Sequence, residues 1–192
     1  MRCRGWETKC REQDKYRDRR KEKRKMEYRY IEEQDAEAFL EMMHGLDRET
    51  KRMMLEPDER TNDVESVRKM IKRKRENGDF FFIAEDGDEI AGMITAERGE
   101  FRRVHHTAYI VTGIREKYRG QGIGSRFFKE LDQWALENQI VRLELTVVGD
   151  NAPAIHLYEK SGFKIEGTRE HSMYIDGQYY DEYYMAKLFP HN

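Results

Sequence analysis

Hydrophobic residues recur along the first third of the chain with strand-like and then helical spacing. A strand-like segment at 26–33 precedes a helix that Asp35 can cap, with apolar positions three or four residues apart. A second helix begins near 61–63 and ends at Asn77-Gly78, where a glycine is a suitable C-terminal stop. The apolar faces of these helices are formed by Ala36, Phe39, Leu40 and Met43, and by Val64, Val67, Met70 and Ile71.

The rest of the chain alternates between strand-like and helical patterns. Runs rich in β-branched and aromatic residues predict strands, and Asp-Gly pairs at 86–87 and 176–177 predict tight turns between them. Strands are expected at 80–86, 89–98, 105–114, 141–148, 163–175 and 178–189, and helices at 125–138 and 152–162. This order predicts a mixed α/β sheet in which only the helix at 125–138 forms a parallel crossover.

Composition indicates one soluble domain with a heavily charged surface. The 192 residues are 39% charged and 38% hydrophobic, and no apolar run approaches the ~20 residues of a membrane helix. The start of the chain has no apolar segment typical of a secretory signal, so a cytoplasmic location is expected. The two cysteines, Cys3 and Cys10, allow one disulfide but neither a disulfide framework nor a four-ligand zinc site, and no metal is expected.

Charge separates an N-terminal extension from the remainder. Residues 1–25 hold 12 Lys and Arg against 5 Asp and Glu, a balance of +7, and residues 11–25 include almost no apolar residue. We interpret residues 1–25 as a solvated basic extension and residues 26–192 as the domain, with Met26 as a candidate natural start. A nucleic-acid or ribosome-binding arm is the alternative, because a basic run is an electrostatic footprint without a base-reading motif.

The stretch YRGQGIGSRF at 118–127 places three glycines before a predicted helix. Glycine costs a helix about 1 kcal/mol relative to alanine, so three of them suggest that a ligand approaches the backbone closely. Successive N–H groups at the positive end of a helix dipole favour an anion such as phosphate. The spacing lacks the Gly-Lys-Ser/Thr of nucleotide triphosphatases and differs from the dinucleotide-binding G-x-G-x-x-G.

Two motifs together resemble the GNAT acyltransferase superfamily. Arg119-x-x-Gly122-x-Gly124 after a strand resembles its acyl-CoA loop, and LELTVVGDNAPAIHLYEKSGF resembles its second signature, with Asn151 after a strand and Tyr158 seven positions later. The resemblance covers roughly residues 26–189. It implies a GNAT-type α/β fold: a mixed, mostly antiparallel twisted sheet with a splayed parallel central pair and about four helices.

The resemblance also implies an acetyl-CoA-dependent N-acetyltransferase with assigned cofactor contacts. Asn151 and the strand end at Thr112, Gly113 and Ile114 would contact acetyl-CoA, and an N–H near Ile114 would stabilise the oxyanion. Tyr158 would act as the general acid. The pyrophosphate would bind the loop at Arg119, Gly120, Gln121, Gly122, Ile123, Gly124 and Ser125. Simpler alternatives are a tight turn for the glycines, a helix cap for Asn151 and a core aromatic for Tyr158.

The general base is left open. Tyr109 falls where many members carry a glutamate, and Thr146 falls where some protein N-terminal acetyltransferases carry another. Glu144, two residues before Thr146, shares its strand face. The other candidates are a chain of water molecules and the residues His105, His106 and His171.

The acceptor is the least constrained element. The closing hairpin is similar to that of the branch containing ribosomal-protein, polyamine and other small-amine acetyltransferases. A small primary amine is favoured over a peptide N-terminus; a CoA-binding or ribosome-associated module without turnover is the rival, and a homodimer is also compatible. Acidic residues that could surround a cationic amine, or form a solvated face, are Asp181, Glu182, Glu32, Glu33, Asp35 and Glu37.

Overall fold

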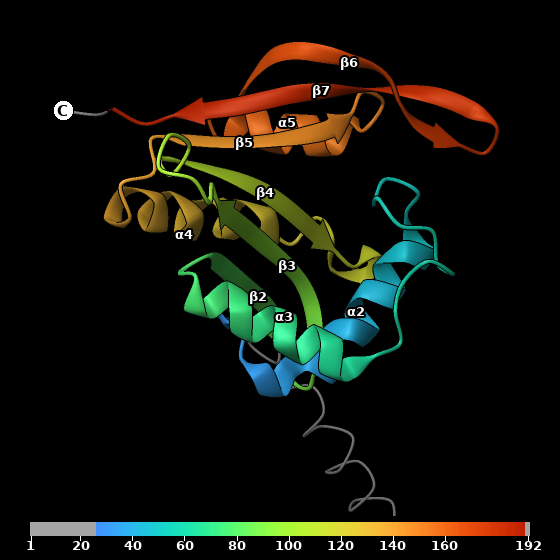
Figure 1. The fold of residues 1–192 in the computed structure, drawn as a ribbon. Helices are drawn as coiled ribbons and strands as arrows, with labels where there is room; N and C mark the ends of the chain where they lie inside the picture. The colour runs from blue at the N-terminus through green and yellow to red at the C-terminus, as the bar shows by residue number, and fades with distance from the viewer. Residues whose placement is uncertain (1–25, 191–192) are drawn as a thin grey trace, which may run out of the picture.

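A computed structural model describes residues 26–190, so the two cysteines and the basic extension lie outside the described residues. Figure 1 shows a single sheet with helices against it. The strands are β1 (Glu27–Tyr30), β2 (Phe80–Asp86), β3 (Glu89–Arg98), β4 (Thr107–Ile114), β5 (Arg142–Val148), β6 (Lys164–Ile175) and β7 (Gln178–Leu188). The α-helices are α2 (Ala36–Glu49), α3 (Val64–Glu76), α4 (Ile123–Glu137) and α5 (Ala152–Lys160); two 3-10 turns are η2 (Glu33–Asp35) and η3 (Glu116–Tyr118).

The sheet has the order β1-β2-β3-β4-β5-β7-β6. Every neighbouring pair is antiparallel except β4 and β5, which are linked through α4. The parallel pairing covers only three residue pairs and ends at Tyr109 opposite Glu144, after which the two strands have no paired residues. The predicted mixed sheet, its single parallel crossover and the splayed central pair are therefore confirmed.

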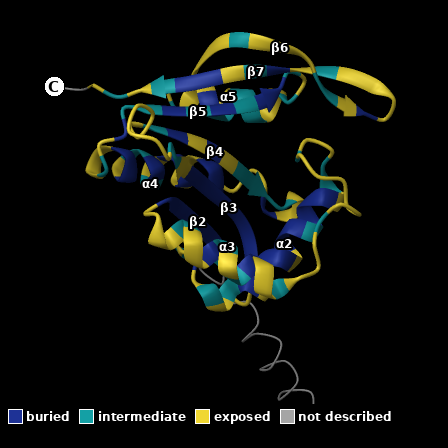
Figure 2. Ribbon diagram, in the orientation of Figure 1, coloured by how far each residue is buried: buried dark blue, intermediate teal, exposed yellow. Residues whose placement is uncertain are grey.

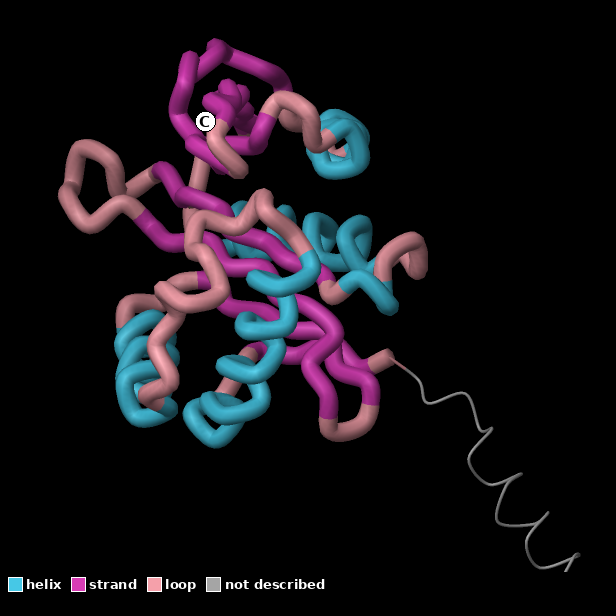
Figure 3. Tube along the Cα trace, turned by 90° about the vertical axis from the view of Figure 1, so that its right-hand side faces the viewer, coloured by secondary structure: helices cyan, strands magenta, loops and turns pink. Residues whose placement is uncertain are grey.

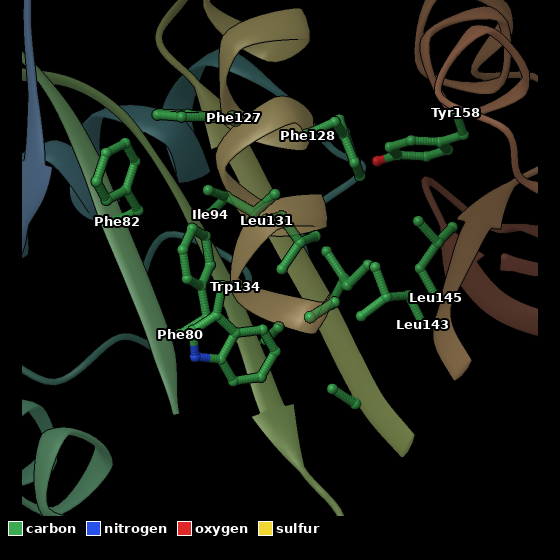
Figure 4. Close-up of a cluster of buried hydrophobic side chains, with 14 of the residues drawn as sticks. Phe80, Phe82, Ile94, Phe127, Phe128, Leu131, Trp134, Leu143, Leu145 and Tyr158 are labelled. Atoms are coloured by element: carbon green, nitrogen blue, oxygen red, sulfur yellow. The ribbon is translucent and has the colours of Figure 1, made fainter. Parts of the chain in front are cut away.

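Helices pack on both faces of the sheet. Phe80 and Phe82 point to the α4 face, whereas Phe81 and Ile83 point to the face covered by α2 and α3, because successive strand residues alternate. This double burial explains the unbroken apolar run of β2. Figure 3 shows the helices on both sides of the strands, and Figure 4 shows α4 inserting Phe127, Leu131 and Trp134 into its core. Figure 2 shows that β6, the edge strand, is largely exposed.

Local sequence signals account for most helix boundaries. The Asp63 side chain accepts a hydrogen bond from the Glu65 N–H and caps α3, as predicted. The Asp35 side chain instead accepts from the Glu32 N–H and from Arg29, so it closes the short turn before α2. Helix α4 begins at Ile123, two residues earlier than predicted, which places Gly124 in its first turn. No helix among the described residues is long and apolar enough to cross a membrane.

Candidate active site

The glycine loop presents a row of free backbone donors at the start of α4. Within residues 26–190, the N–H groups of residues 120–125 donate to no protein atom, and no side chain caps the helix. The first intrahelical bond begins only at Arg126, whose N–H donates to the Gly122 carbonyl. The positive end of the helix dipole points the same way, so the loop is suited to bind a phosphate or pyrophosphate.

The three glycines serve different purposes. Gly120 and Gly122 have φ of +73° and +83°, the left-handed region that favours glycine, and nothing lies within 4 Å of a Cβ built on either. Gly124 is different, because a Cβ there would lie 2.6 Å from the Leu157 side chain of α5. The first two glycines therefore shape the loop and keep its outer surface open, whereas Gly124 allows α4 and α5 to pack closely.

The splay leaves backbone groups of β4 without strand partners. Hydrogen bonds from Gly99 N–H to Thr107 O and from Arg115 N–H to Ala91 O fix the odd-numbered residues of β4 as those bonded to β3. The N–H and C=O groups of Thr112 and Ile114 consequently point towards β5, beyond the last parallel pair, whereas those of Gly113 point towards β3.

Some of the polar groups of Thr112 and Ile114 already take part in hydrogen bonds within residues 26–190, and others do not. The Ile114 carbonyl accepts from the Arg119 side chain at 3.2 Å, and the Thr112 hydroxyl donates to the Met93 carbonyl. The Ile114 N–H and the Thr112 backbone are thus the groups that a ligand amide or an oxyanion could contact. Gly113 lies against Leu46 of α2, where a Cβ would come within 2.6 Å, so its glycine is explained by packing.

Helix α5 brings Asn151 and Tyr158 to the same side of the site. Asn151 is the first residue before α5, but its side chain makes no capping hydrogen bond, so its amide is available for another partner. The Tyr158 ring packs edge-on against Phe128, with ring centres 5.6 Å apart, and Figure 4 shows its hydroxyl directed away from α5.

The Tyr158 hydroxyl is suited to donate a proton. Burial, with a smaller effect from nearby Tyr109, raises the pKa of Tyr158 to about 12. The hydroxyl forms no hydrogen bond with residues 26–190. Tyr158 is 8% exposed. Its hydroxyl is not one of the fully enclosed side-chain atoms that lack a hydrogen-bond partner within residues 26–190, which are Asp79 Oδ2 and Arg98 Nε. With this raised pKa, the hydroxyl is protonated at neutral pH, which is the state from which a general acid must start.

Tyr109 and Thr146, the two positions where a glutamate was absent, are brought together by the fold. The Tyr109 hydroxyl lies 2.9 Å from the Thr146 hydroxyl, across the point where β4 and β5 separate. Glu144 is held by Arg142 at 2.6 Å. Sequence reasoning named these residues singly but not their contact, which depends on the strand register.

The histidine candidates lie elsewhere. His105 and His106 occupy the loop between β3 and β4, where the His105 ring contacts the Gly99 carbonyl and Arg98. His171 lies in the irregular part of β6 and packs against Tyr179. Each of the contacts that we observe for these rings is structural.

The acidic residues that the sequence suggested as surroundings for a cationic amine do not lie together in the fold. Residues 32–37 lie beside β1 at one edge of the sheet, whereas Asp181 and Glu182 lie on β7, with four strands between them. At about 4.8 Å per strand, this separation is on the order of 24 Å. Glu182 is buried and contacts Arg169 at 3.5 Å. Only the pair on β7 is near Thr146, because Glu182 is two residues from Tyr184, the partner of Thr146.

Two ion pairs that the sequence did not suggest connect the segment after α2 to the C-terminal half. Lys51 pairs with Asp176 of the β6–β7 turn at 2.5 Å, and Arg52 pairs with Asp150 before α5 at 3.1 Å. The segment therefore lies beside the loops that follow β5 and β6. No sequence signal could have found them, because each joins residues about a hundred positions apart.

Comparison with known proteins agrees with this geometry. The acetyltransferase (GNAT) family matches residues 40–163. The chain is 36% identical over 107 residues to the L-amino acid N-acetyltransferase AaaT of Escherichia coli K12, covering 54% of this chain and 64% of that protein. It is 34% identical over 111 residues to the spermidine N(1)-acetyltransferase of the same organism, covering 57% and 58%. The match thus spans less than two thirds of either relative.

A solved structure extends the likeness over most of the described chain. The acetyltransferase of the GNAT family from Streptococcus pneumoniae superposes with a TM-score of 0.82 and 29% identity, covering 86% of this chain and 100% of that one. The family match spans well over half of the chain and includes the glycine loop, β5 and α5. This chain therefore belongs to the acetyltransferase (GNAT) family.

Proposed function

We propose that this protein transfers an acetyl group from acetyl-CoA to the primary amine of a small molecule. The observation that carries the proposal is the row of N–H groups at residues 120–125 that have no partner within residues 26–190, together with the unpaired backbone of Thr112 and Ile114 at the end of β4. Pyrophosphate fits the first feature and the amides of a pantetheine arm fit the second, since both need partners in a dry cleft. The relatives named for acetylating L-amino acids and spermidine support a small amine as acceptor.

The reaction is direct attack on the thioester. The amine nitrogen forms a bond to the carbonyl carbon, and the carbonyl electrons move to the oxygen, where the Ile114 N–H can stabilise the charge. Collapse restores the C=O bond and breaks the C–S bond. Tyr158 gives its proton to the departing sulfur, and the proton lost from the acylated nitrogen replaces it. The products are the acetylamide and CoA thiol.

Incubation with acetyl-CoA and a panel of amines tests the proposal through release of free thiol. The panel contains L-amino acids, diamines, polyamines, monoamines and short peptides. Turnover that is saturable in a small amine is the expected result. Preferential turnover of peptides would instead favour a protein N-terminal acetyltransferase. Binding of CoA without turnover across the panel would favour a CoA-binding module.

A further inference from the structure

The side chain of Tyr109 occupies the centre of the face opposite α4. Its neighbours in β4, Ala108 and Ile110, are buried in the α4 core, whereas Tyr109 is 41% exposed on the other face. Its last backbone partner in β5 is Glu144, so the side chain stands where the parallel ladder ends. A group in this position faces the space into which the splay opens.

The hydrogen bond between Tyr109 and Thr146 crosses that opening. With either hydroxyl as donor, the pair retains one O–H and several lone pairs for a third group. Such a pair can accept a hydrogen bond from an amine. A hydroxyl cannot hold an additional proton near neutral pH, however, which a carboxylate at the same position could.

Among the described residues, the carboxylates opposite Tyr109 on the two flanking strands are paired with cations. Glu97 lies directly opposite on β3 and is bonded to Lys74 of α3 at 2.7 Å, and this ammonium holds the pKa of Glu97 below its usual range. Glu144 is bonded to Arg142 of its own strand, which also binds Glu166 of β6.

The other titratable groups near the pair lie on β7 and α5. On β7, Glu182 contacts Arg169 of β6, and Tyr184 lies opposite Thr146. From α5, the nearest titratable group is Tyr158, which the proposed reaction uses as a donor. Within residues 26–190, none of these groups is an unpaired carboxylate.

We propose that the Tyr109–Thr146 pair contacts the acceptor nitrogen and that the protein takes its acceptor as the neutral free base. This inference rests on the proposed acetyl transfer. An ammonium at this position would exchange part of its hydration for two neutral hydroxyls and gain no unpaired carboxylate from residues 26–190, so the charged form is disfavoured. The ammonium therefore gives its first proton to water before binding, and the neutral amine arrives with its lone pair available for the attack on the thioester.

The pH dependence of kcat/KM tests the inference. The acceptors are the best small amine of the panel and its analogue fluorinated next to the amine-bearing carbon, which lowers the amine pKa with little change in size. We expect kcat/KM to rise with pH until the amine is neutral. The rising part of the profile, its acidic limb, should therefore lie at lower pH for the fluorinated analogue than for the parent amine. A limb at one fixed pH for both acceptors would reveal a protein base and overturn the inference.

Variants of the pair separate contact from packing. Tyr109→Phe and Thr146→Val should each lower the plateau of kcat/KM about 10-fold, the loss of one hydrogen bond, without moving the limb or changing acetyl-CoA affinity. Tyr179→Phe removes an exposed hydroxyl from β7 and is the matched control, with unchanged rates expected. Unchanged plateaus in both Tyr109→Phe and Thr146→Val would overturn the contact.

A gain-of-function variant tests the same idea in the other direction. Tyr109→Glu introduces a carboxylate at this position, so the acidic limb of its kcat/KM profile should lie at the same pH for both amines. An acidic limb that still shifts with the pKa of the amine would contradict the reasoning. If this variant does not fold, the two hydroxyl deletions still decide the matter. Absence of turnover with every amine in the wild-type protein would refute the proposed acetyl transfer itself, an outcome distinct from a misplaced limb.

Discussion

Removal of the Tyr158 hydroxyl separates chemistry from folding at this site. In Tyr158→Phe the ring keeps its packing against Phe128, and no hydrogen bond within residues 26–190 is lost. The free energy of unfolding at pH 7 should therefore stay within about 0.5 kcal/mol of wild type. Turnover should fall about 100-fold, or ~2.7 kcal/mol of barrier, the lower end for an acid, because a thiol with a pKa of about 8.5 leaves readily.

The same variant should change stability only in alkali. Burial raises the pKa of Tyr158 to about 12, whereas an unfolded tyrosine titrates at about 10. Below pH 10 both states are protonated and the full stability is present. Between about pH 10 and 12 the unfolded chain ionises first, so stability falls with rising pH. At pH 11 this loss is about 1.4 kcal/mol, and Tyr158→Phe should not show it.

Urea unfolding at pH 7 and pH 11, with single-turnover thiol release, measures both effects. The difference between wild type and variant isolates Tyr158 from the other tyrosines that titrate in this range. Equal alkaline losses in the two proteins would show that the hydroxyl is not buried as described. Unchanged turnover when chemistry limits the rate would make Tyr158 a packing residue, and a pure loss of acetyl-CoA affinity would make it a cofactor contact.

Three further predictions concern the glycine loop, the start of α4 and the N-terminal extension. Gly122→Val should weaken the binding of CoA to the folded protein, because valine disfavours the left-handed φ and its side chain enters the open face of the loop. An unchanged CoA affinity, measured by calorimetry, would contradict the assignment of the loop as the pyrophosphate site. Gly124→Val should instead act mainly on stability and lower the melting temperature, because its side chain would clash with Leu157. Deletion of residues 1–25 should leave acetyl transfer intact, and a large loss in the folded, truncated protein would show that the extension belongs to the site.

The order and type of the elements could be predicted because each one carries a local signal. Asp63 and Asn77-Gly78 mark the ends of α3, and the Asp176-Gly177 pair marks the β6–β7 turn. The start of α4 was predicted too late, because glycine disfavours helix in isolation, whereas packing of Gly124 against Leu157 stabilises the first turn. This contact is between residues distant in sequence, so no local pattern reports it.

The site was predictable only as far as its motifs extend. The loop and Tyr158 follow from the resemblance to the GNAT superfamily, but the Tyr109–Thr146 contact requires the register of two parallel strands and the position at which they separate. The backbone N–H and C=O groups of Thr112 and Ile114 point towards β5, and those of Gly113 point towards β3. This alternation likewise depends on the pairing of β4 with β3. A motif can name these three residues together, although they differ in which of their backbone groups a ligand can reach.

The end of the parallel ladder links the two halves of the proposed chemistry. Tyr109 reaches it from the face opposite α4, and Tyr158 reaches it from α5 on the α4 side. Since a neutral hydroxyl is not a base near pH 7, the acceptor must supply the lone pair by itself. A peptide α-amine, with a pKa of about 7.7–8.0, is neutral roughly 300-fold more often than an alkylamine with a pKa of about 10.4. A small alkylamine acceptor must therefore offset this factor through tighter binding of its neutral form.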